Sequence, residues 1–102
     1  MAGEPEVMAL HLKIQGRVQR VWYRQWLVGE ARNRGIRGWV RNRSDGSVEA
    51  VLSGDMSAVR ALVQACHQGP PKAQVSRITQ IPGEYRPTED DFPDEFRQLP
   101  TL

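Results

Sequence analysis

The sequence is poor in the residues that build disulfide frameworks, metal centres and membrane spans. One cysteine, Cys66, and two histidines, His11 and His67, are present among its 102 residues. A lone cysteine excludes an intrachain disulfide framework, and so few thiols and imidazoles leave no conventional zinc site. No apolar run approaches the ~20 residues that span a bilayer, and the first residues lack the pattern of a signal peptide. We therefore expect a cytoplasmic chain that binds no metal or other cofactor and does not associate with membranes.

The length and composition fit one folded domain. Two separate cores within 102 residues would each be too small for stability, so residues 1–102 are expected to form one domain with its core at about 7–99. Hydrophobic residues make up 39% of the chain and charged residues 25%, which favours a packed core over disorder.

Acidic residues are scarce where basic residues gather. The net charge is only +2, and arginine supplies 12 of the 14 basic residues. From Lys13 to Arg43 there are nine basic residues and one acid, Glu30, whereas residues 84–95 hold six acids and Arg86. An uneven charge distribution of this kind attracts an anion to the basic region, without specifying which anion.

The first half of the chain alternates between strand and helix patterns. Apolar and polar residues alternate over residues 8–14, which predicts a half-buried strand that ends at Gly16. A helical period runs from about 21 to 34, and Gly35 stands where a left-handed helix end belongs. Alternation over residues 36–42 then predicts a second strand.

The second half begins with a turn and contains the clearest amphipathic helix. Asp45-Gly46 predicts a tight turn into a third strand over residues 48–52. Apolar residues spaced over 59–66 predict a helix, which Asp55 caps and Gly69-Pro70-Pro71 stops. The remaining expectations are a fourth strand at 75–81, a loop at 82–93 and a short final strand at 96–99.

The element order β-α-β-β-α-β indicates an α+β fold of the ferredoxin-like, split βαβ kind. Right-handed crossovers place the third strand between the first and the second. The result is a mostly antiparallel four-stranded sheet in the order 4-1-3-2, with two helices on one face. The first and second strands then end at the same edge, about 10 Å apart. We therefore expect the loop after Ile14 and the residue Asn42 to face the same corner of the molecule.

The loop before the first helix has the features of an anion site. No Ser, Thr, Asp or Asn caps the helix, so its first N–H groups have no side-chain partner. Arg17, Arg20 and Arg24 surround the positive end of the helix dipole, where cations are disfavoured. One interpretation is that a phosphate or carboxylate binds there; the other is that water caps the amides and solvates the arginines.

Three segments give the chain a family resemblance. They are GRVQRVWYR at residues 16–24, RGIRGWVRNRSDGSVEAVLSG at 34–54 and GPPKAQV at 69–75. Together they closely resemble the acylphosphatase family, whose fold is the ferredoxin-like sandwich inferred above. The resemblance implies hydrolysis of small-molecule acyl phosphates to a carboxylate and inorganic phosphate, by a monomer without a metal.

The resemblance also implies a role for each matching residue. The backbone amides of the phosphate loop would hold the phosphoryl oxygens, and the Arg24 guanidinium would bind the same group and stabilise its charge. Asn42 would position the attacking water, since an amide both donates and accepts without repelling phosphate. The loop amides belong to Arg17, Val18, Gln19, Arg20 and Val21.

Arg20 departs from the family pattern, which usually has glycine at this position. If the backbone there has a positive φ, an arginine costs about 1–2 kcal/mol and misdirects one amide. If it does not, Arg20 adds positive charge beside the phosphate and slows product release. The departure leaves a catalytically weakened, anion-binding or regulatory module as the alternative function.

An RNA-binding function has less support. Ferredoxin-like sheets bind RNA through exposed aromatic residues on their central strands, and the segments LHLKI and VEAVL carry none. The basic stretch alone supports weak, salt-sensitive binding of polyanions. Nucleic acid is therefore not an expected partner.

Overall fold

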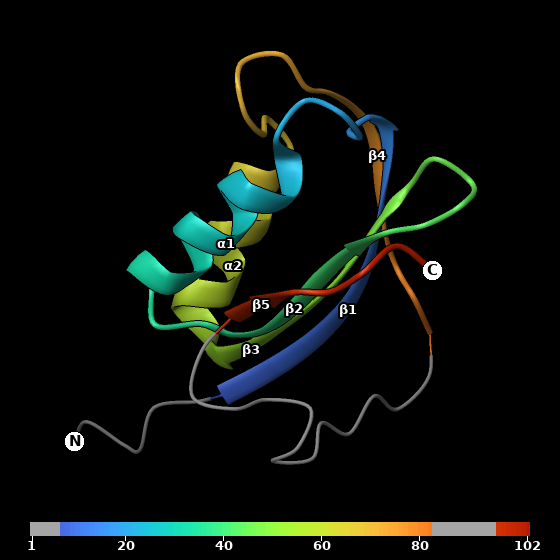
Figure 1. The fold of residues 1–102 in the computed structure, drawn as a ribbon. Helices are drawn as coiled ribbons and strands as arrows, with labels where there is room; N and C mark the ends of the chain where they lie inside the picture. The colour runs from blue at the N-terminus through green and yellow to red at the C-terminus, as the bar shows by residue number, and fades with distance from the viewer. Residues whose placement is uncertain (1–6, 83–95) are drawn as a thin grey trace, which may run out of the picture.

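The patterns of alternation become strands, and the two helical periods become helices. The structure is a computed structural model that describes residues 7–82 and 96–102 (Figure 1). Both helices have 11 residues, and they follow β1 and β3 along the chain. The elements are β1 (Val7–Arg17), α1 (Tyr23–Asn33), β2 (Arg37–Asn42), β3 (Val48–Asp55), α2 (Met56–Cys66), β4 (Gln74–Gln80) and β5 (Phe96–Gln98).

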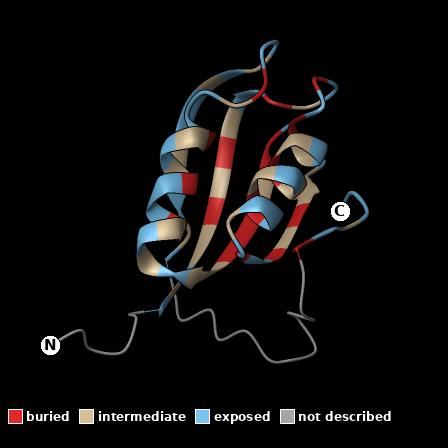
Figure 2. Cartoon of the chain, turned by 90° about the vertical axis from the view of Figure 1, so that its left-hand side faces the viewer, coloured by how far each residue is buried: buried red, intermediate tan, exposed pale blue. Residues whose placement is uncertain are grey.

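The sheet has the order β4-β1-β3-β2-β5, and both helices cover one of its faces (Figures 1 and 2). The predicted four-stranded order 4-1-3-2 is confirmed for the core of the sheet. Pairing is antiparallel for β1 with β3, β1 with β4, and β2 with β3. The expected final strand forms as β5 and makes the sheet five-stranded, because it pairs in parallel with the free edge of β2.

The core lies between the helices and the sheet. Leu27 and Ala31 of α1 and Leu62 of α2 are fully buried, as the helical spacing predicts. They pack against inward-facing strand residues such as Ile14 and Val40, and buried residues gather on this inner side (Figure 2). Burying a side chain of this size contributes about 1.5–3 kcal/mol, so this layer is the main source of stability.

Gly16 does not end the first strand, contrary to the expectation. β1 continues to Arg17 through a shift of register after Gln15, where it pairs with β4. Gly16 has φ 121°, and an added Cβ would collide with the carbonyl oxygen of Gln74. Glycine therefore allows a β-bulge at this position. The bulge directs the following loop toward the N-terminus of α1.

Two other expectations concern the ends of elements. Gly35 has φ 68° and follows α1, which confirms the left-handed helix end. Asp55 accepts a hydrogen bond from the Ala58 N–H at 3.2 Å, which confirms the cap of α2. The loop expected at 82–93 lies outside the described residues, except for Pro82.

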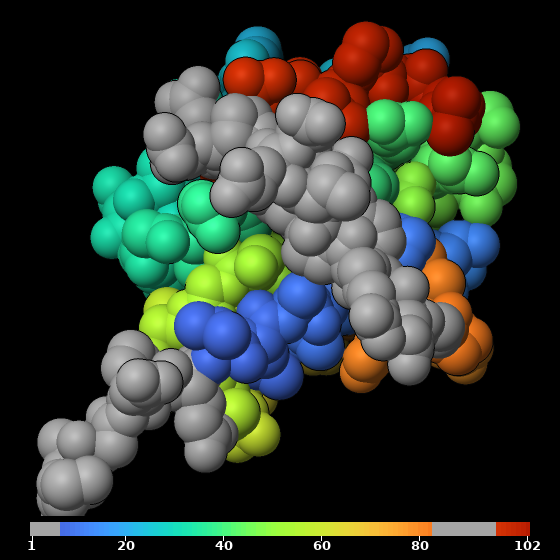
Figure 3. Space-filling view, turned by 90° about the horizontal axis from the view of Figure 1, so that it is seen from below, coloured from blue at the N-terminus to red at the C-terminus, as the bar shows by residue number. Residues whose placement is uncertain are grey.

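The C-terminal residues run alongside β2, in the same direction, toward the β2–β3 hairpin, and they lie beside it in the space-filling view (Figure 3). The Leu102 N–H donates to the Asn42 carbonyl at 3.1 Å, and the Ser44 N–H donates to the Leu102 carbonyl at 3.0 Å. The end of β2 is therefore fixed on both edges, by β3 and by the C-terminal residues. Within the described part of the chain, neither helix is long and apolar enough to cross a bilayer.

Candidate active site

The loop between β1 and α1 is held to the core by two buried valines. Val18 and Val21 are buried, with exposed fractions of 1% and 7%, whereas Arg17 and Arg20 are exposed. Arg20 has φ 63° and Trp22 has φ 66°, both in the left-handed region. That region costs about 1–2 kcal/mol for an L-residue, so the first of the two alternatives for Arg20, a strained backbone, is the one observed.

Gln19 ties this loop to the β2–β3 hairpin. Its side-chain Nε2 donates to the carbonyl oxygens of Arg43 and Ser47, at 2.8 Å each. The hairpin is itself tightened by Asp45, whose carboxylate accepts from the Ser47 hydroxyl at 2.6 Å and from the Ser47 N–H at 2.9 Å. These hydrogen bonds lower the pKa of Asp45, with a further contribution from Lys13. The side-chain role of Gln19 was missed from the sequence, which indicated its backbone amide alone.

The first turn of α1 has no side-chain cap at its N-terminus. Trp22 precedes the helix with φ 66° and ψ 21°, and it makes no side-chain capping hydrogen bond. The first turn contains no acidic residue. Its free N–H groups therefore retain the partial positive charge of the helix end, and they face the same space as Arg24, the second residue of the helix.

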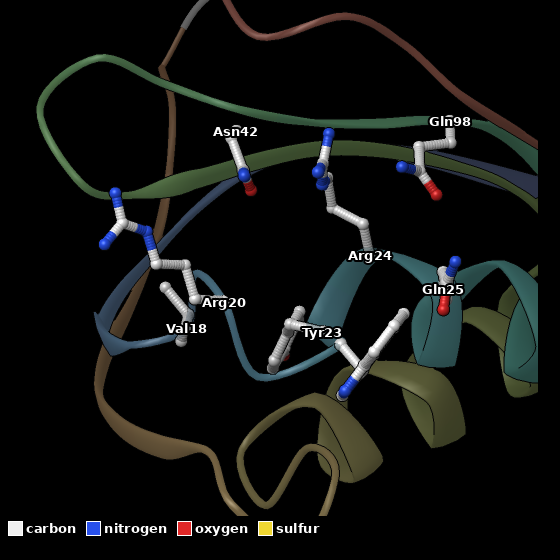
Figure 4. A pocket seen from close by; sticks show the side chains of 8 residues that line it. Val18, Arg20, Tyr23, Arg24, Gln25, Asn42 and Gln98 are labelled. Atoms are coloured by element: carbon white, nitrogen blue, oxygen red, sulfur yellow. The ribbon is translucent and has the colours of Figure 1, made fainter.

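A pocket of about 250 Å³ opens between this loop, α1 and the ends of β2 and β5 (Figure 4). The side chains of Arg24 and Asn42 converge there from α1 and β2 (Figure 4). Val18 and Arg20 also line it, whereas Arg17, Gln19 and Val21 do not. The described residues that line the pocket are Val18, Arg20, Trp22, Tyr23, Arg24, Gln25, Asn42 and Gln98.

Asn42 presents a buried acceptor at the pocket. It follows Gly38 and Val40 on the helix-covered face of β2, and this period of two directs its side chain under the loop. Its Oδ1 is buried and has no hydrogen-bond partner within the described residues. A buried acceptor without a partner costs about 1–3 kcal/mol, so the fold maintains this oxygen at the expense of stability.

Gln25 and Gln98 line the pocket and were not among the predicted site residues. Gln98 belongs to β5, where Phe96 is fully buried and its carbonyl accepts from the Arg32 guanidinium at 3.0 Å and 3.2 Å. Residues two apart in a strand share a face, so Gln98 lies on the helix side with Phe96. That alternation indicates which face of β5 carries Gln98, whereas its place at the pocket also depends on the pairing of β5 with β2.

The pocket is positively charged because the described residues that line it include two arginines and no acid. Arg20 and Arg24 have no acidic partner within residues 7–82 and 96–102. An arrangement of guanidinium groups and free helix amides is suited to an anion with several oxygens, such as a phosphoryl group. In the same part of the chain, no group of three His, Cys, Asp or Glu side chains is placed to hold a metal ion.

Tyr23 and Cys66 stabilise the base of the pocket and take no part in its chemistry. The Tyr23 hydroxyl donates to the Cys66 carbonyl oxygen at 2.7 Å, which joins the start of α1 to the end of α2. Burial raises the pKa of the Cys66 thiol to about 12 and also raises the pKa of Tyr23. Both groups are therefore protonated at neutral pH, and Cys66 belongs to the buried core.

The opposite face of the sheet has a separate polar cluster. His11 contacts the Glu49 carboxylate, and Arg43 pairs with the same carboxylate at 3.2 Å. Trp39 lies edge-on to the His11 ring, and the Arg41 guanidinium is 5.0 Å from the Trp39 ring centroid. None of these side chains lines the pocket.

Comparisons with known proteins agree with this geometry. The acylphosphatase family model matches residues 10–93. The acylphosphatase of Azorhizobium caulinodans is 51% identical over 83 residues, which cover 81% of this chain and 89% of the relative. That of Thiobacillus denitrificans is 54% identical over 78 residues, which cover 74% and 88%.

A solved structure supports the same assignment. The crystal structure of acylphosphatase from Bacillus subtilis has a TM-score of 0.79 and 32% sequence identity, over 92% of this chain and 99% of that one. Sequence and fold therefore agree over nearly the whole length of both proteins. The chain belongs to the acylphosphatase family.

Proposed function

We propose that this chain hydrolyses acyl phosphates in the pocket between the β1–α1 loop and the end of β2. The observation that carries the proposal is the meeting of Arg24 with Asn42, a cation and a buried unpaired acceptor from two different elements. Membership of the acylphosphatase family supports the reaction class.

Arg24 and the loop amides hold the phosphoryl group in this mechanism. The backbone N–H groups of residues 17–21 donate to its oxygens, and the Arg24 guanidinium binds it in a charge-assisted pair. Negative charge on those oxygens is stabilised by donors that are already in place, so little reorganisation is needed during the reaction. Because this positive charge comes from the protein, we propose that the reaction needs no metal ion.

Asn42 positions the nucleophile. Its Oδ1 accepts a hydrogen bond from a water molecule, which attacks phosphorus in line with the acyl oxygen. A new P–O bond forms while the bond from phosphorus to the bridging oxygen breaks. That oxygen keeps the electron pair and leaves as a carboxylate, and a proton of the water passes to the phosphate product or to solvent.

We propose that the enzyme acts as a monomer, as the family resemblance implies. The acyl phosphate is the proposed small-molecule partner, and inorganic phosphate is the product. Cys66 is a buried free thiol, which agrees with the proposed cytoplasmic location.

Steady-state hydrolysis of benzoyl phosphate with a chelator present tests the function. We expect turnover by the parent protein and a loss of about 10²–10³-fold in kcat/KM for Arg24→Ala, because one charged donor is removed from the reacting group. Arg37→Ala is the matched control, since Arg37 is exposed at the far end of the strand that carries Asn42. Turnover that survives in Arg24→Ala, or that needs added metal, contradicts the mechanism.

Phosphate binding separates the roles of the two residues. Phosphate should stabilise the parent protein and Asn42→Ala against heat, whereas Arg24→Ala should lose this stabilisation. Asn42→Ala should lose kcat, and Asn33→Ala, at the exposed end of α1, should retain it. If the parent protein binds phosphate but shows no turnover, the alternative of an anion-binding module is correct.

A further inference from the structure

Arg20 extends a guanidinium beside the pocket at a point separate from Arg24. Arg20 belongs to the β1–α1 loop, and Arg24 belongs to α1. In the close view Asn42 lies between the two guanidinium groups, which point to different sides of it (Figure 4). A phosphoryl group held by Arg24 and the loop amides, with its attacking water on Asn42, therefore leaves the end of Arg20 available for another group.

The charge of Arg20 is not neutralised within the described part of the chain. Some other cations there do have carboxylate partners: Arg34 pairs with Glu30 at 3.3 Å, and Lys13 pairs with Asp45 at 3.0 Å. Arg20 has no such partner, although its side chain lines the pocket. Its backbone is also held at φ 63°, a conformation that arginine rarely adopts. The fold therefore keeps a strained, unpaired cation at the edge of an anion site.

We propose that Arg20 binds a second anionic group of the substrate, and that the chain prefers acyl phosphates whose acyl part carries a carboxylate. This inference rests on the proposed function, because it assigns the phosphoryl group to Arg24 and the loop amides. The pocket of about 250 Å³ leaves room for a short acyl chain beside a phosphoryl group. A guanidinium matches the two oxygens of a carboxylate, so Arg20 recognises this group by geometry as well as by charge.

The contact acts on binding more than on the chemical step. The distal carboxylate keeps its charge while the bond to phosphorus breaks, so Arg20 stabilises the ground state and the transition state equally. An interaction of this kind lowers KM and leaves kcat unchanged. Since Arg20 is exposed, we expect a preference of about fivefold in kcat/KM, which corresponds to an exposed ion pair of about 1 kcal/mol.

Fumaryl monophosphate and crotonyl phosphate are a matched pair of substrates for the test. They share a trans carbon chain and differ in a carboxylate in place of a methyl group. The trans double bond also keeps that carboxylate from attacking the anhydride. We expect the parent protein to favour the fumaryl compound about fivefold, mainly in KM, and more strongly at low salt.

The variants assign the preference to Arg20. Arg20→Gln and Arg20→Gly should bring the ratio of the two kcat/KM values to about one, and Arg20→Lys should keep part of it. Because Arg20→Gln keeps a long side chain and Arg20→Gly relieves the positive φ, a shared result is independent of backbone strain. Arg37→Gln removes an exposed arginine far from the pocket and should leave the ratio unchanged.

The outcomes distinguish this inference from the proposed function. Equal kcat/KM values for both substrates in the parent protein overturn the inference and leave acyl phosphate hydrolysis in place. A ratio that survives in Arg20→Gln also overturns it, since Arg20 then does not bind the carboxylate. An equal loss of kcat/KM for both substrates overturns it as well, since Arg20 then acts on the phosphoryl group that they share. If the parent protein hydrolyses neither compound, the proposed function fails and the inference fails with it.

Discussion

The two helices of this fold begin in opposite ways. α2 starts after Asp55, which has extended backbone angles of φ −56° and ψ 132° and whose carboxylate accepts from the Ala58 N–H at 3.2 Å. α1 starts after Trp22, which has left-handed angles and makes no side-chain capping hydrogen bond. Both helices have 11 residues, pack on the same face of the sheet and connect two strands that have one other strand between them, so helix length and packing do not explain the difference.

The difference shows where the chain uses its helix amides for stability and where it leaves them for a ligand. At α2 a side chain of the protein occupies the first turn, which stabilises the helix. At α1 the same groups stay open, and arginines gather around the positive end of the dipole. That arrangement lowers the stability of the β1–α1 loop. The buried side chains of Val18, Val21 and Tyr23 hold the loop in place.

The residues that precede α1 should tolerate substitution far less well than the residues that precede α2. Gly16→Ala places a Cβ against the Gln74 carbonyl and the Ser76 N–H, at a φ of 121°, so we expect a loss of about 3 kcal/mol or more in unfolding free energy. Gly54→Ala is the matched control: its Cβ would lie 3.6 Å from Ile36, which is ordinary contact, and the expected change is within about 1 kcal/mol. Urea unfolding measures both, and equal losses would show that the bulge at Gly16 tolerates a side chain.

Tyr23 replaces a cap in holding the start of α1. Tyr23→Phe leaves the buried Cys66 carbonyl without its donor at 2.7 Å, so we expect a loss of about 1–2 kcal/mol in unfolding free energy. Cys66→Ala keeps that carbonyl and should preserve the hydrogen bond. The double variant of Tyr23→Phe with Cys66→Ala therefore shows whether the loss comes from the bond to the carbonyl and not from the thiol. If Tyr23→Phe is as stable as the parent protein, the hydroxyl does not anchor the helix.

The cap of α2 should affect stability without affecting the anion site. Asp55→Ala removes the acceptor of the Ala58 N–H and should lower the unfolding free energy by about 1 kcal/mol, with a smaller loss for Asp55→Asn. Phosphate should stabilise the parent protein and Asp55→Ala by the same increment, because α2 lies apart from the pocket lining. Thermal unfolding with and without phosphate measures both effects. A smaller phosphate increment in Asp55→Ala would mean that the two helix ends are coupled.

Much of the fold could be predicted because its strands and helices show clear periods in the sequence. The edge that β5 joins could not, since β2 and β4 both offer free strand edges in a four-stranded sheet. The burial of Phe96 and the hydrogen bonds from Arg32 to its carbonyl accompany the pairing with β2 in the structure. These contacts join residues 64 apart in the chain, and periodicity does not reveal contacts at that separation.

The site was also predicted only in part, because some of its features depend on contacts between segments that are distant in the chain. Topology and family resemblance bring Arg24 and Asn42 to one corner, and the structure places both at the pocket. Gln98 depends on the placement of β5, and the hydrogen bonds of the Gln19 side chain depend on the position of the β2–β3 hairpin. The left-handed conformation of Trp22 could not be predicted either, because tryptophan rarely adopts it.

Trp22 gives the most direct measure of the strain at α1. It combines φ 66° with an exposed fraction of 71%, so little buried surface offsets the cost of its backbone conformation. Trp22→Asn should raise the unfolding free energy by about 0.5–1 kcal/mol, because asparagine tolerates the left-handed region better than other side chains do. Trp22→Phe keeps both the strain and an aromatic ring, and it should leave stability unchanged. A less stable Trp22→Asn would mean that indole packing outweighs the strain. A more stable one would mean that the fold holds the residue before α1 in a conformation that lowers stability. The start of α2, with its aspartate cap and no positive φ, shows that the fold does not require such a conformation to begin a helix.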